Sequence, residues 1–145
     1  MLLDQIQAKD IQIGLAAADW QDAIRKAAAP LAAEGAITER YIDGMIQSVL
    51  KNGPYFVLSK GLALAHTRPE CGANRLALNF STFDPPVCFG AGENDPVRLI
   101  ITLAATDSNS HIDLLSELAE ILMDDDRMEQ LFAVQSPEEF CRLLA

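Results

Sequence analysis

The chain reads Val97-Arg98-Leu99-Ile100-Ile101-Thr102-Leu103 in its second half, and this stretch decides the fold. It is almost continuously apolar and rich in β-branched residues, which is the pattern of a strand covered on both faces. Strands of this kind lie inside sheets that carry helices on both sides. We therefore expect residues 97–103 to form a central, interior strand.

Shorter strand patterns precede this stretch. Residues 55–58 and 62–65 are short apolar runs, and residues 75–80 alternate between apolar and polar side chains as a half-exposed strand does. Two further segments, Asp84-Pro85-Pro86 and residues 90–96, are dense in turn-forming residues that cannot continue a ladder of strand hydrogen bonds. We expect both of these segments to be loops.

Helical patterns occupy the first third of the chain. Apolar side chains repeat at helical spacing over residues 19–34, where Asp19 can accept hydrogen bonds from the free amides of the first turn. A second apolar stripe begins after Thr38 and stops at Gly53-Pro54. Gly35 lies between the two segments, where it can cap the first helix, so we expect a helical hairpin.

The last third of the chain is helical as well. Ser110 is followed three residues later by an aspartate, which is close to a capping box, and leucines then repeat at helical spacing. Residues 124–133 predict a short helix, and Ser136-Pro137-Glu138-Glu139 predicts a closing helix that ends at Leu144. The whole of residues 1–145 is therefore predicted to be one α/β domain, a sandwich whose mixed parallel and antiparallel sheet is flanked by helices.

The overall charge limits the kinds of partner. The formal net charge is −10 and the basic residues are scattered, so the surface repels nucleic acid and anionic lipid. An acidic surface favours a basic patch on another protein by raising the rate of encounter. No uncharged apolar run reaches the length of about 18 residues that a membrane span needs. The N-terminal residues lack a secretion signal, so we expect a soluble, cytoplasmic protein that does not insert into a membrane.

The cysteines do not indicate a metal centre. Cys71, Cys88 and Cys141 are widely spaced, and an odd number of cysteines does not complete a disulfide framework or match a paired zinc-ligand spacing. We expect them to be reduced. The sequence predicts no metal and no cofactor.

The chain has only two histidines, and both occupy places where folds commonly expose chemistry. His66 ends the apolar run 61–65 and enters a loop, and His111 follows Ser110 in the first turn of a predicted helix. A neutral imidazole has one nitrogen that can attack phosphorus and one N–H that a neighbour can hold. One histidine could therefore carry a phosphoryl group while the other donates a hydrogen bond to its oxygens.

Ordinary readings of these residues remain open at this point. A lone histidine after a strand is more often a boundary residue than a nucleophile, and His111 is more often a solvated first-turn residue. Two histidines without a carboxylate or cysteine at ligand spacing do not define a metal site. Cys71 could act as a thiol nucleophile with a histidine, but nothing around it indicates a lowered pKa.

Three segments together resemble a known family. Residues 61–66, residues 94–105 and Ser110-His111 with its leucine-rich helix resemble the phosphorylation motif and active-site segments of the mannitol/fructose family of enzyme IIA domains. These domains belong to the bacterial phosphoenolpyruvate-dependent sugar phosphotransferase system. Residues 53–58 and 66–70 are similar to the ascorbate-type branch in particular. The resemblance covers nearly the whole chain in order.

The resemblance implies a relay of phosphate. The small carrier HPr gives a phosphoryl group to His66, His66 passes it to a cysteine of enzyme IIB, and IIB phosphorylates the sugar that the membrane component IIC carries. His111 matches a second histidine that assists the phosphoryl group without carrying it. Many family members have proline where this chain has Ala65, and arginine where it has Leu50-Lys51. Lys51 or Arg68 is then a candidate for the positive charge near the phosphate, with Ser110 as a further supporting residue.

Alternatives to this function remain. The chain could be a regulatory member of the same fold, whose His66 phosphorylation state controls a partner protein, or a protein-binding module that carries no phosphate. The sequence does not specify the transported sugar, for which ascorbate or a related sugar is the candidate, because IIC and IIB select it. It also leaves a homodimer open.

Overall fold

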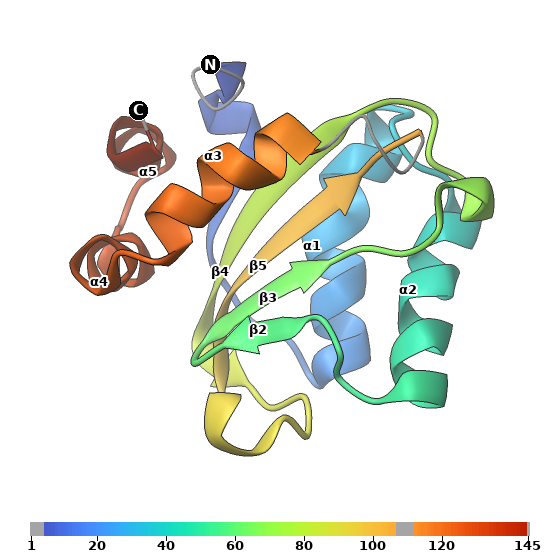
Figure 1. Ribbon diagram of the computed structural model, residues 1–145, viewed down its shortest axis with the longest axis horizontal. Helices are drawn as coiled ribbons and strands as arrows, with labels where there is room; N and C mark the ends of the chain where they lie inside the picture. Colours follow the sequence, from blue (N-terminus) through green and yellow to red (C-terminus); the bar gives the residue numbers. More distant parts are fainter. Residues whose placement is uncertain (1–4, 107–111, 145) are drawn as a thin grey trace.

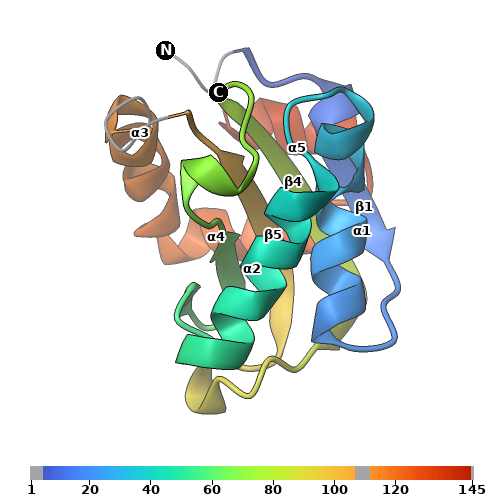
Figure 2. The same ribbon diagram turned by 90° about the vertical axis from the view of Figure 1, so that its right-hand side faces the viewer.

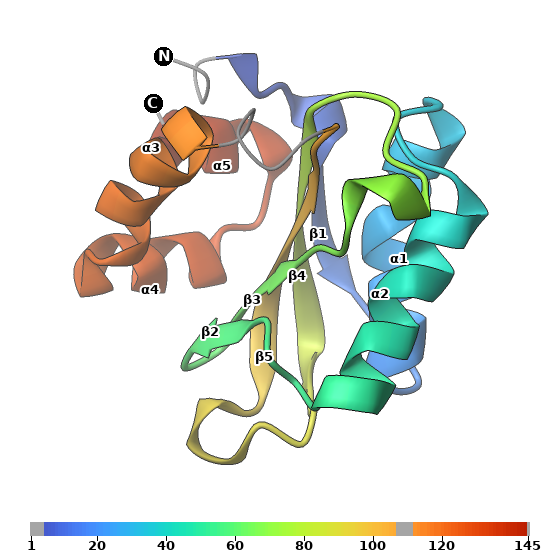
Figure 3. The ribbon, with the colours of Figure 1, turned by 45° about the vertical axis from the view of Figure 1, so that its right-hand side comes forward.

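The computed structural model describes residues 5–106 and 112–144, which form a sheet between two layers of helices (Figures 1 and 3). Helices α1 and α2 cover one face of the sheet, and α3, α4 and α5 cover the other, which confirms the predicted sandwich. The strands are β1 (Ile11–Leu15), β2 (Val57–Ser59), β3 (Leu62–Ala65), β4 (Ala77–Val87) and β5 (Val97–Ala104). The helices are α1 (Trp20–Ala33), α2 (Glu39–Asn52), α3 (Ile112–Leu122), α4 (Asp125–Ala133) and α5 (Pro137–Leu144).

Strand β5 is the middle strand of the sheet, whose order is β1-β4-β5-β3-β2. It pairs antiparallel with β4 and parallel with β3, while β1 runs parallel to β4 and β2 antiparallel to β3, so the sheet is mixed as predicted. Ile100 is 0% exposed and Leu103 is 4% exposed, which confirms that this strand is interior. Because β3 and β5 are parallel, with Ala65 opposite Thr102, their C-terminal ends meet at one edge of the sheet.

The apolar side chains of the central strands alternate between two cores. Because successive side chains of a strand point to opposite faces, each strand supplies both cores. The core under α1 and α2 includes Ala63, Ala65, Phe83, Val97, Ile100 and Ala104. The core under α3, α4 and α5 includes Leu62, Leu64, Leu78, Phe80, Leu99, Ile101 and Leu103.

Helices α1 and α2 form the predicted hairpin and lie side by side (Figure 2). Asp19 Oδ1 accepts from the amide of Asp22 at 2.8 Å, and Thr38 caps α2 in the same way. Gly35 follows α1 with φ +79°, a left-handed conformation that a side chain rarely adopts. These caps confirm both predicted starts and the predicted turn.

Strand β1, which the sequence patterns above did not predict, supplies a hydrogen-bond donor that α1 lacks. Pro30 lies inside α1 and has no N–H to donate to the carbonyl of Lys26, one turn earlier. Gln12 of β1 supplies the missing donor, because its Nε2 lies 3.0 Å from the Lys26 oxygen. The same Nε2 lies 2.9 Å from Ser81 Oγ, so one side chain ties the edge strand to both α1 and β4.

Two expectations about β4 are wrong. Residues 75–80 were expected to be half exposed, yet Asn79 is fully buried, and it accepts from Ser81 Oγ at 2.7 Å. The alternation of apolar and polar residues reflects two covered faces, one of which holds a buried polar cluster that includes Asn79 and Ser81. Asp84-Pro85-Pro86 was expected to be a loop, but β4 continues through it to Val87. The pairing shifts between Thr82 and Val87, so the two exposed prolines lie where the β4–β5 ladder has no registered partners and their missing N–H groups are tolerated.

The C-terminal helices start as predicted. Asp124 accepts from the amide of Arg127 at 3.1 Å, and Ser136 accepts from the amide of Glu139 at 3.2 Å. The predicted helix after Ser110 is present from Ile112 onward as α3, while Ser110 itself lies outside the described residues. Within the described ranges, no helix has the length and apolar character of a membrane span.

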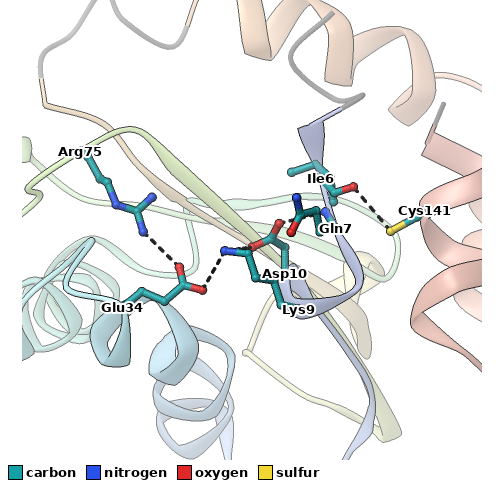
Figure 4. Close-up of polar contacts among 7 residues, drawn as sticks. All are labelled: Ile6, Gln7, Lys9, Asp10, Glu34, Arg75 and Cys141. Carbon is teal, nitrogen blue, oxygen red and sulfur yellow. Dashed lines mark hydrogen bonds and ion pairs between the residues drawn. The ribbon is translucent and has the colours of Figure 1, made fainter.

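The segment before β1 joins α1 to α5 (Figure 4). Glu34, after the end of α1, lies 3.3 Å from Lys9 Nζ and 3.1 Å from Arg75 Nη2, and these ion pairs are partly exposed. On the other side, the thiol of Cys141 in α5 contacts the carbonyl of Ile6 at 3.7 Å. The N-terminal segment therefore contacts both helical layers at this edge of the sheet.

Candidate functional site

His66 directly follows β3, where the chain leaves the C-terminal edge of the sheet. This is the position that the sequence predicts. Because β3 is paired on both sides, with β5 and β2, the main chain that leads into His66 is fixed by strand hydrogen bonds. The side chain is partly buried, so it is reachable from solvent and also held by the protein. Such an edge is where open α/β sheets bind their ligands.

The ring of His66 is oriented by a hydrogen bond. Its Nδ1 lies 2.8 Å from the carbonyl oxygen of Leu64. A carbonyl oxygen can only accept, so Nδ1 carries the proton and donates it. Nε2 is then the ring nitrogen with the lone pair. The ring of Tyr55 packs against the imidazole with its centroid 5.7 Å away at 80°, which limits rotation of the histidine.

Two tyrosine hydroxyls contact the main chain around His66. Tyr55 donates to the carbonyl of His66 at 2.9 Å, and the amide of Thr67 donates to the hydroxyl of Tyr41 at 3.3 Å. Tyr41 donates in turn to the carbonyl of Leu103 on β5 at 2.8 Å. Burial raises the pKa of Tyr41 to about 12 and also raises the pKa of Tyr55, so both hydroxyls keep their protons at neutral pH.

A cleft of about 580 Å³ opens beside His66. It is formed by one face of α2, by Tyr55 and by the loop that follows β3. Lys51 and Arg68 are exposed and lie in its wall, and neither makes an ion pair with a residue in the described ranges. The lining residues are Gly44, Gln47, Ser48, Lys51, Asn52, Tyr55, His66, Thr67, Arg68 and Cys71.

The charge of this cleft differs from that of the whole chain. The chain carries 21 acidic residues against 11 basic ones, yet the described lining contains Lys51 and Arg68 and neither Asp nor Glu. A dianionic phosphoryl group in the cleft would meet two cations and no nearby lining carboxylate. Such an environment favours phosphate over a cationic ligand.

The wall of the cleft is closely packed at Gly44. A Cβ atom at this position of α2 would lie 3.3 Å from Thr67 Cγ2 and from Cys71 Sγ, which is tighter than ordinary contact. Glycine therefore lets the helix approach the loop after His66. Ser48 adds a hydroxyl contact of 3.3 Å to Thr67, so α2 supports this loop along its length.

The structure brings together part of the predicted site. His66, Lys51 and Arg68 share one cleft, and Cys71 lies in the same wall. Ser110 and His111 lie outside the described residues, so their predicted contact with His66 stays a prediction. Among the described residues, no cluster of three or more metal-ligating side chains occurs.

Tyr41 and Tyr55 were not predicted to belong to the site. The available signal was weak, because Tyr41 belongs to the apolar stripe of α2, where a tyrosine reads as a core residue. A fully buried phenol needs a hydrogen-bond partner, but the pattern does not indicate which one.

Comparisons with known proteins agree on one family. The family described as phosphoenolpyruvate-dependent sugar phosphotransferase system, EIIA 2, matches residues 4–145. The chain is 33% identical over 144 residues to the mannitol-specific cryptic phosphotransferase enzyme IIA component of Escherichia coli (strain K12), a match that covers 99% of this chain and 97% of that protein. It is 33% identical over 137 residues to the ascorbate-specific PTS system EIIA component of Shigella boydii serotype 4 (strain Sb227), covering 94% of this chain and 89% of that protein.

A solved structure extends the likeness to three dimensions. In the complex of enzyme IIAMTL and phosphorylated enzyme IIBMTL from Escherichia coli, the matching chain has a TM-score of 0.84 and 28% identity, and the match covers 97% of this chain and 96% of that one. The family match spans nearly the whole chain, and the fold agrees with it. The chain therefore belongs to the mannitol- and ascorbate-type enzyme IIA family of the phosphoenolpyruvate-dependent sugar phosphotransferase system.

Proposed function

We propose that this protein carries a phosphoryl group on Nε2 of His66, accepting it from phospho-HPr and passing it to a cysteine of enzyme IIB in the cytoplasm. Membership of the enzyme IIA family already assigns a role in a sugar phosphotransfer relay. The observation that carries the finer assignment is the hydrogen bond from His66 Nδ1 to Leu64, because it leaves the lone pair on Nε2.

The chemistry follows from this tautomer. The Nε2 lone pair attacks the phosphorus of phospho-HPr, a bond from nitrogen to phosphorus forms, and the bond between phosphorus and HPr breaks with its electron pair left on HPr. The imidazole becomes positively charged as the new bond forms, so its Nδ1–H donates more strongly to the Leu64 carbonyl. A hydrogen bond that strengthens during the reaction lowers the barrier. In the second transfer a thiolate of IIB attacks the same phosphorus, and Nε2 leaves with its lone pair restored.

Lys51 and Arg68 are the proposed electrostatic support. Phosphoryl transfer depends mainly on positioning and on charge stabilisation, and both cations lie in the wall of the His66 cleft. We also propose that His111, which directly precedes α3 in the sequence, donates a hydrogen bond to the phosphoryl oxygens. The resemblance of Ser110-His111 to the family's second active-site segment supports this role.

Incubation with phosphoenolpyruvate, enzyme I and HPr tests the carrier function. The wild-type protein should gain one phosphoryl group, and addition of a matching IIB should remove it. The phosphate should be labile in acid and stable in base, as expected for a phosphohistidine and not for a phosphoserine. A protein that gains no phosphate under these conditions would instead be a binding module of the enzyme IIA fold. Phosphate that is gained but not passed to any IIB would favour a regulatory member of the family.

For the sugar, we propose ascorbate or a related compound. The support is the similarity of residues 53–58 and 66–70 to the ascorbate-type branch, together with the match to an ascorbate-specific relative. The match to a mannitol-specific relative is equally high in identity, so the preference for a partner IIB is the deciding measurement. Phosphorylated protein offered to an ascorbate-type and a mannitol-type IIB at equal concentration should transfer faster to the ascorbate type. Faster transfer to the mannitol type would overturn this choice of sugar.

A further inference from the structure

We infer that both tyrosines of this chain act as positioning residues for His66, because their hydroxyls bind the two ends of one peptide group, the one that joins His66 to Thr67. The carbonyl end, on His66, accepts from Tyr55 at 2.9 Å. The amide end, on Thr67, donates to Tyr41 at 3.3 Å. This inference rests on the proposed function of His66 as the phosphoryl acceptor.

The two tyrosines prevent this peptide group from rotating. Both of its polar atoms already have partners, so a flip would break two hydrogen bonds at once. Before His66 the main chain is held in β3, where Leu64 pairs with Ile101 of β5. The residue is therefore held by strand pairing on one side and by phenol groups on the other.

The ring is fixed by the same arrangement. His66 Nδ1 bonds to the Leu64 carbonyl two residues earlier, and this contact restricts the main-chain torsion angles at His66. Tyr55 also packs its ring edge-on against the imidazole. If the peptide after His66 were free to rotate, the imidazole would no longer be confined to one direction, and Nε2 would point along a range of lines.

The two tyrosines are anchored differently. Tyr41 is 1% exposed, and its hydroxyl also donates to Leu103 of β5, so it links the loop after His66 to the central strand. Tyr55 is 42% exposed and lies between α2 and β2. We expect Tyr41 to supply the rigid, buried anchor, whereas the shorter but solvent-exposed bond from Tyr55 holds the other end of the peptide group.

Alignment of this kind matters for transfer between two proteins. The attacking nitrogen, the phosphorus and the leaving atom must lie roughly in line, and small misplacements of a catalytic group cost large factors in rate. Removal of either hydroxyl should therefore slow the transfer while the phosphate-accepting atom stays present. The expected loss is about tenfold for each tyrosine, and more when both are changed.

The test uses Tyr41→Phe and Tyr55→Phe, which keep each ring and remove only the hydroxyl. The rate of phosphorylation by phospho-HPr is measured together with two signals that do not need the reaction. The first is hydrogen exchange of the Thr67 amide, which should become about tenfold faster in Tyr41→Phe because the amide loses its partner. The second is the nitrogen NMR spectrum of the His66 ring, in which the share of the Nδ1–H tautomer should fall.

Thr82→Val is the matched control. Thr82 is 5% exposed, and its hydroxyl accepts from the amide of Gly14 at 2.8 Å, so its loss also removes a buried hydroxyl that binds the main chain. This contact joins β1 to β4 and touches no residue of the His66 cleft. The control should lose stability without a change in the phosphorylation rate, the Thr67 amide or the His66 ring.

The inference is overturned if both tyrosine variants match the wild type in rate, in Thr67 exchange and in the His66 ring signals. A loss of rate that Thr82→Val reproduces would also overturn it, since general destabilisation would then explain the effect. Should Tyr41→Phe fail to fold, Tyr55→Phe decides with the phosphorylation rate and the His66 ring signals. If the wild type gains no phosphate, the proposed function fails, while Thr67 exchange and the His66 ring still test the positioning itself.

Discussion

Nδ1 of His66 lies 2.8 Å from the main-chain oxygen of Leu64, a residue of the strand that leads to the histidine. The strand therefore supplies both the position of the imidazole and its tautomer. No carboxylate is needed to orient the ring, because a carbonyl acceptor within the same strand performs that task. The consequence is that the two ring nitrogens are not equivalent, and only Nε2 can bond to phosphorus without breaking this contact.

We predict that the phosphorylated protein carries its phosphate on Nε2 of His66. Phosphorus and nitrogen NMR of the phosphorylated protein should show a bond to Nε2 and a retained Nδ1–H. His66→Ala should gain no phosphate. Its free energy of unfolding should lie within about 1 kcal/mol of that of the wild type, because this side chain is only partly buried at the sheet edge. Acid-labile phosphate on His66→Ala, or phosphate on Nδ1 of the wild type, would contradict the assignment.

The two cations of the cleft can be separated by charge removal. Whichever of the two side chains contacts the phosphate, its replacement in Lys51→Met or Arg68→Met should slow phosphorylation about tenfold. This loss corresponds to about 1.4 kcal/mol in activation free energy. Lys60→Met is the matched control, since Lys60 is exposed in the turn before β3, at the other end of that strand from His66. Steady-state rates at two salt concentrations separate contact from long-range attraction, because only the latter weakens strongly with salt. If Lys51→Met and Arg68→Met are phosphorylated as fast as the control Lys60→Met, neither cation touches the phosphate.

His111→Ala should still accept phosphate, but slowly. A histidine that only donates a hydrogen bond to the phosphoryl oxygens leaves the nucleophile intact when it is removed. The loss of one such bond from a transition state is typically worth about 2 to 4 kcal/mol, roughly a hundredfold to a thousandfold in rate. Rapid-quench measurement of phosphorylation and of transfer to IIB distinguishes this from the complete loss expected of His66→Ala. Wild-type rates in both steps would make His111 an ordinary first-turn residue.

Much of the fold could be predicted from local patterns. The continuous apolar run of β5 indicated a central strand, and Asp19, Thr38, Asp124 and Ser136 marked helix starts, because a cap acts on amides within three residues of itself. Contacts between distant segments could not be predicted in this way. Gln12 reads as an ordinary polar residue until the fold brings it to the carbonyl that Pro30 leaves without a donor.

The site was predictable only in part for the same reason. His66 ends a short apolar strand, which is a local signal, and the family resemblance added its role. The hydroxyl of Tyr41 contacts Thr67 and Leu103, which are distant in the sequence and become neighbours only when β3 and β5 pair. A tyrosine in an apolar helical stripe indicates burial but not the main-chain groups that its hydroxyl will bind.

The contact between Gln12 and α1 makes a stability prediction. Gln12→Leu should lower the free energy of unfolding by about 1 to 3 kcal/mol, since the carbonyl of Lys26 and the hydroxyl of Ser81 would each lose a donor. Gln130→Leu makes the same chemical change on the exposed surface of α4 and should stay within about 0.5 kcal/mol of the wild type. Urea denaturation at neutral pH gives both values. Equal values for the two variants would mean that water satisfies the Lys26 carbonyl as well as Gln12 does.

The raised pKa of Tyr41 predicts a loss of stability in alkali. Burial raises this pKa from its ordinary value of 10.0 to about 12, so the protonated phenol is favoured in the folded protein. The contribution of Tyr41 to the free energy of unfolding is fully present below about pH 10, where the tyrosine of the unfolded chain is also protonated. This contribution is lost as the pH rises toward 12. A shift of this size corresponds to about 3 kcal/mol in the free energy of unfolding.

Urea denaturation at intervals from pH 8 to pH 12 measures this loss, and the absorbance of ionised tyrosine reports each titration directly. Tyr41→Phe should be less stable at pH 8, because the Thr67 amide loses its acceptor and the Leu103 carbonyl its donor, but its stability should fall less steeply above pH 10. Burial also raises the pKa of Tyr55 and that of the Cys141 thiol, so part of the slope should remain in Tyr41→Phe, and it should become smaller in the double variant with Tyr55→Phe. An unchanged slope in Tyr41→Phe would mean that Tyr41 ionises as readily in the folded protein as in the unfolded chain, and that its hydroxyl is not the buried anchor of the loop after His66.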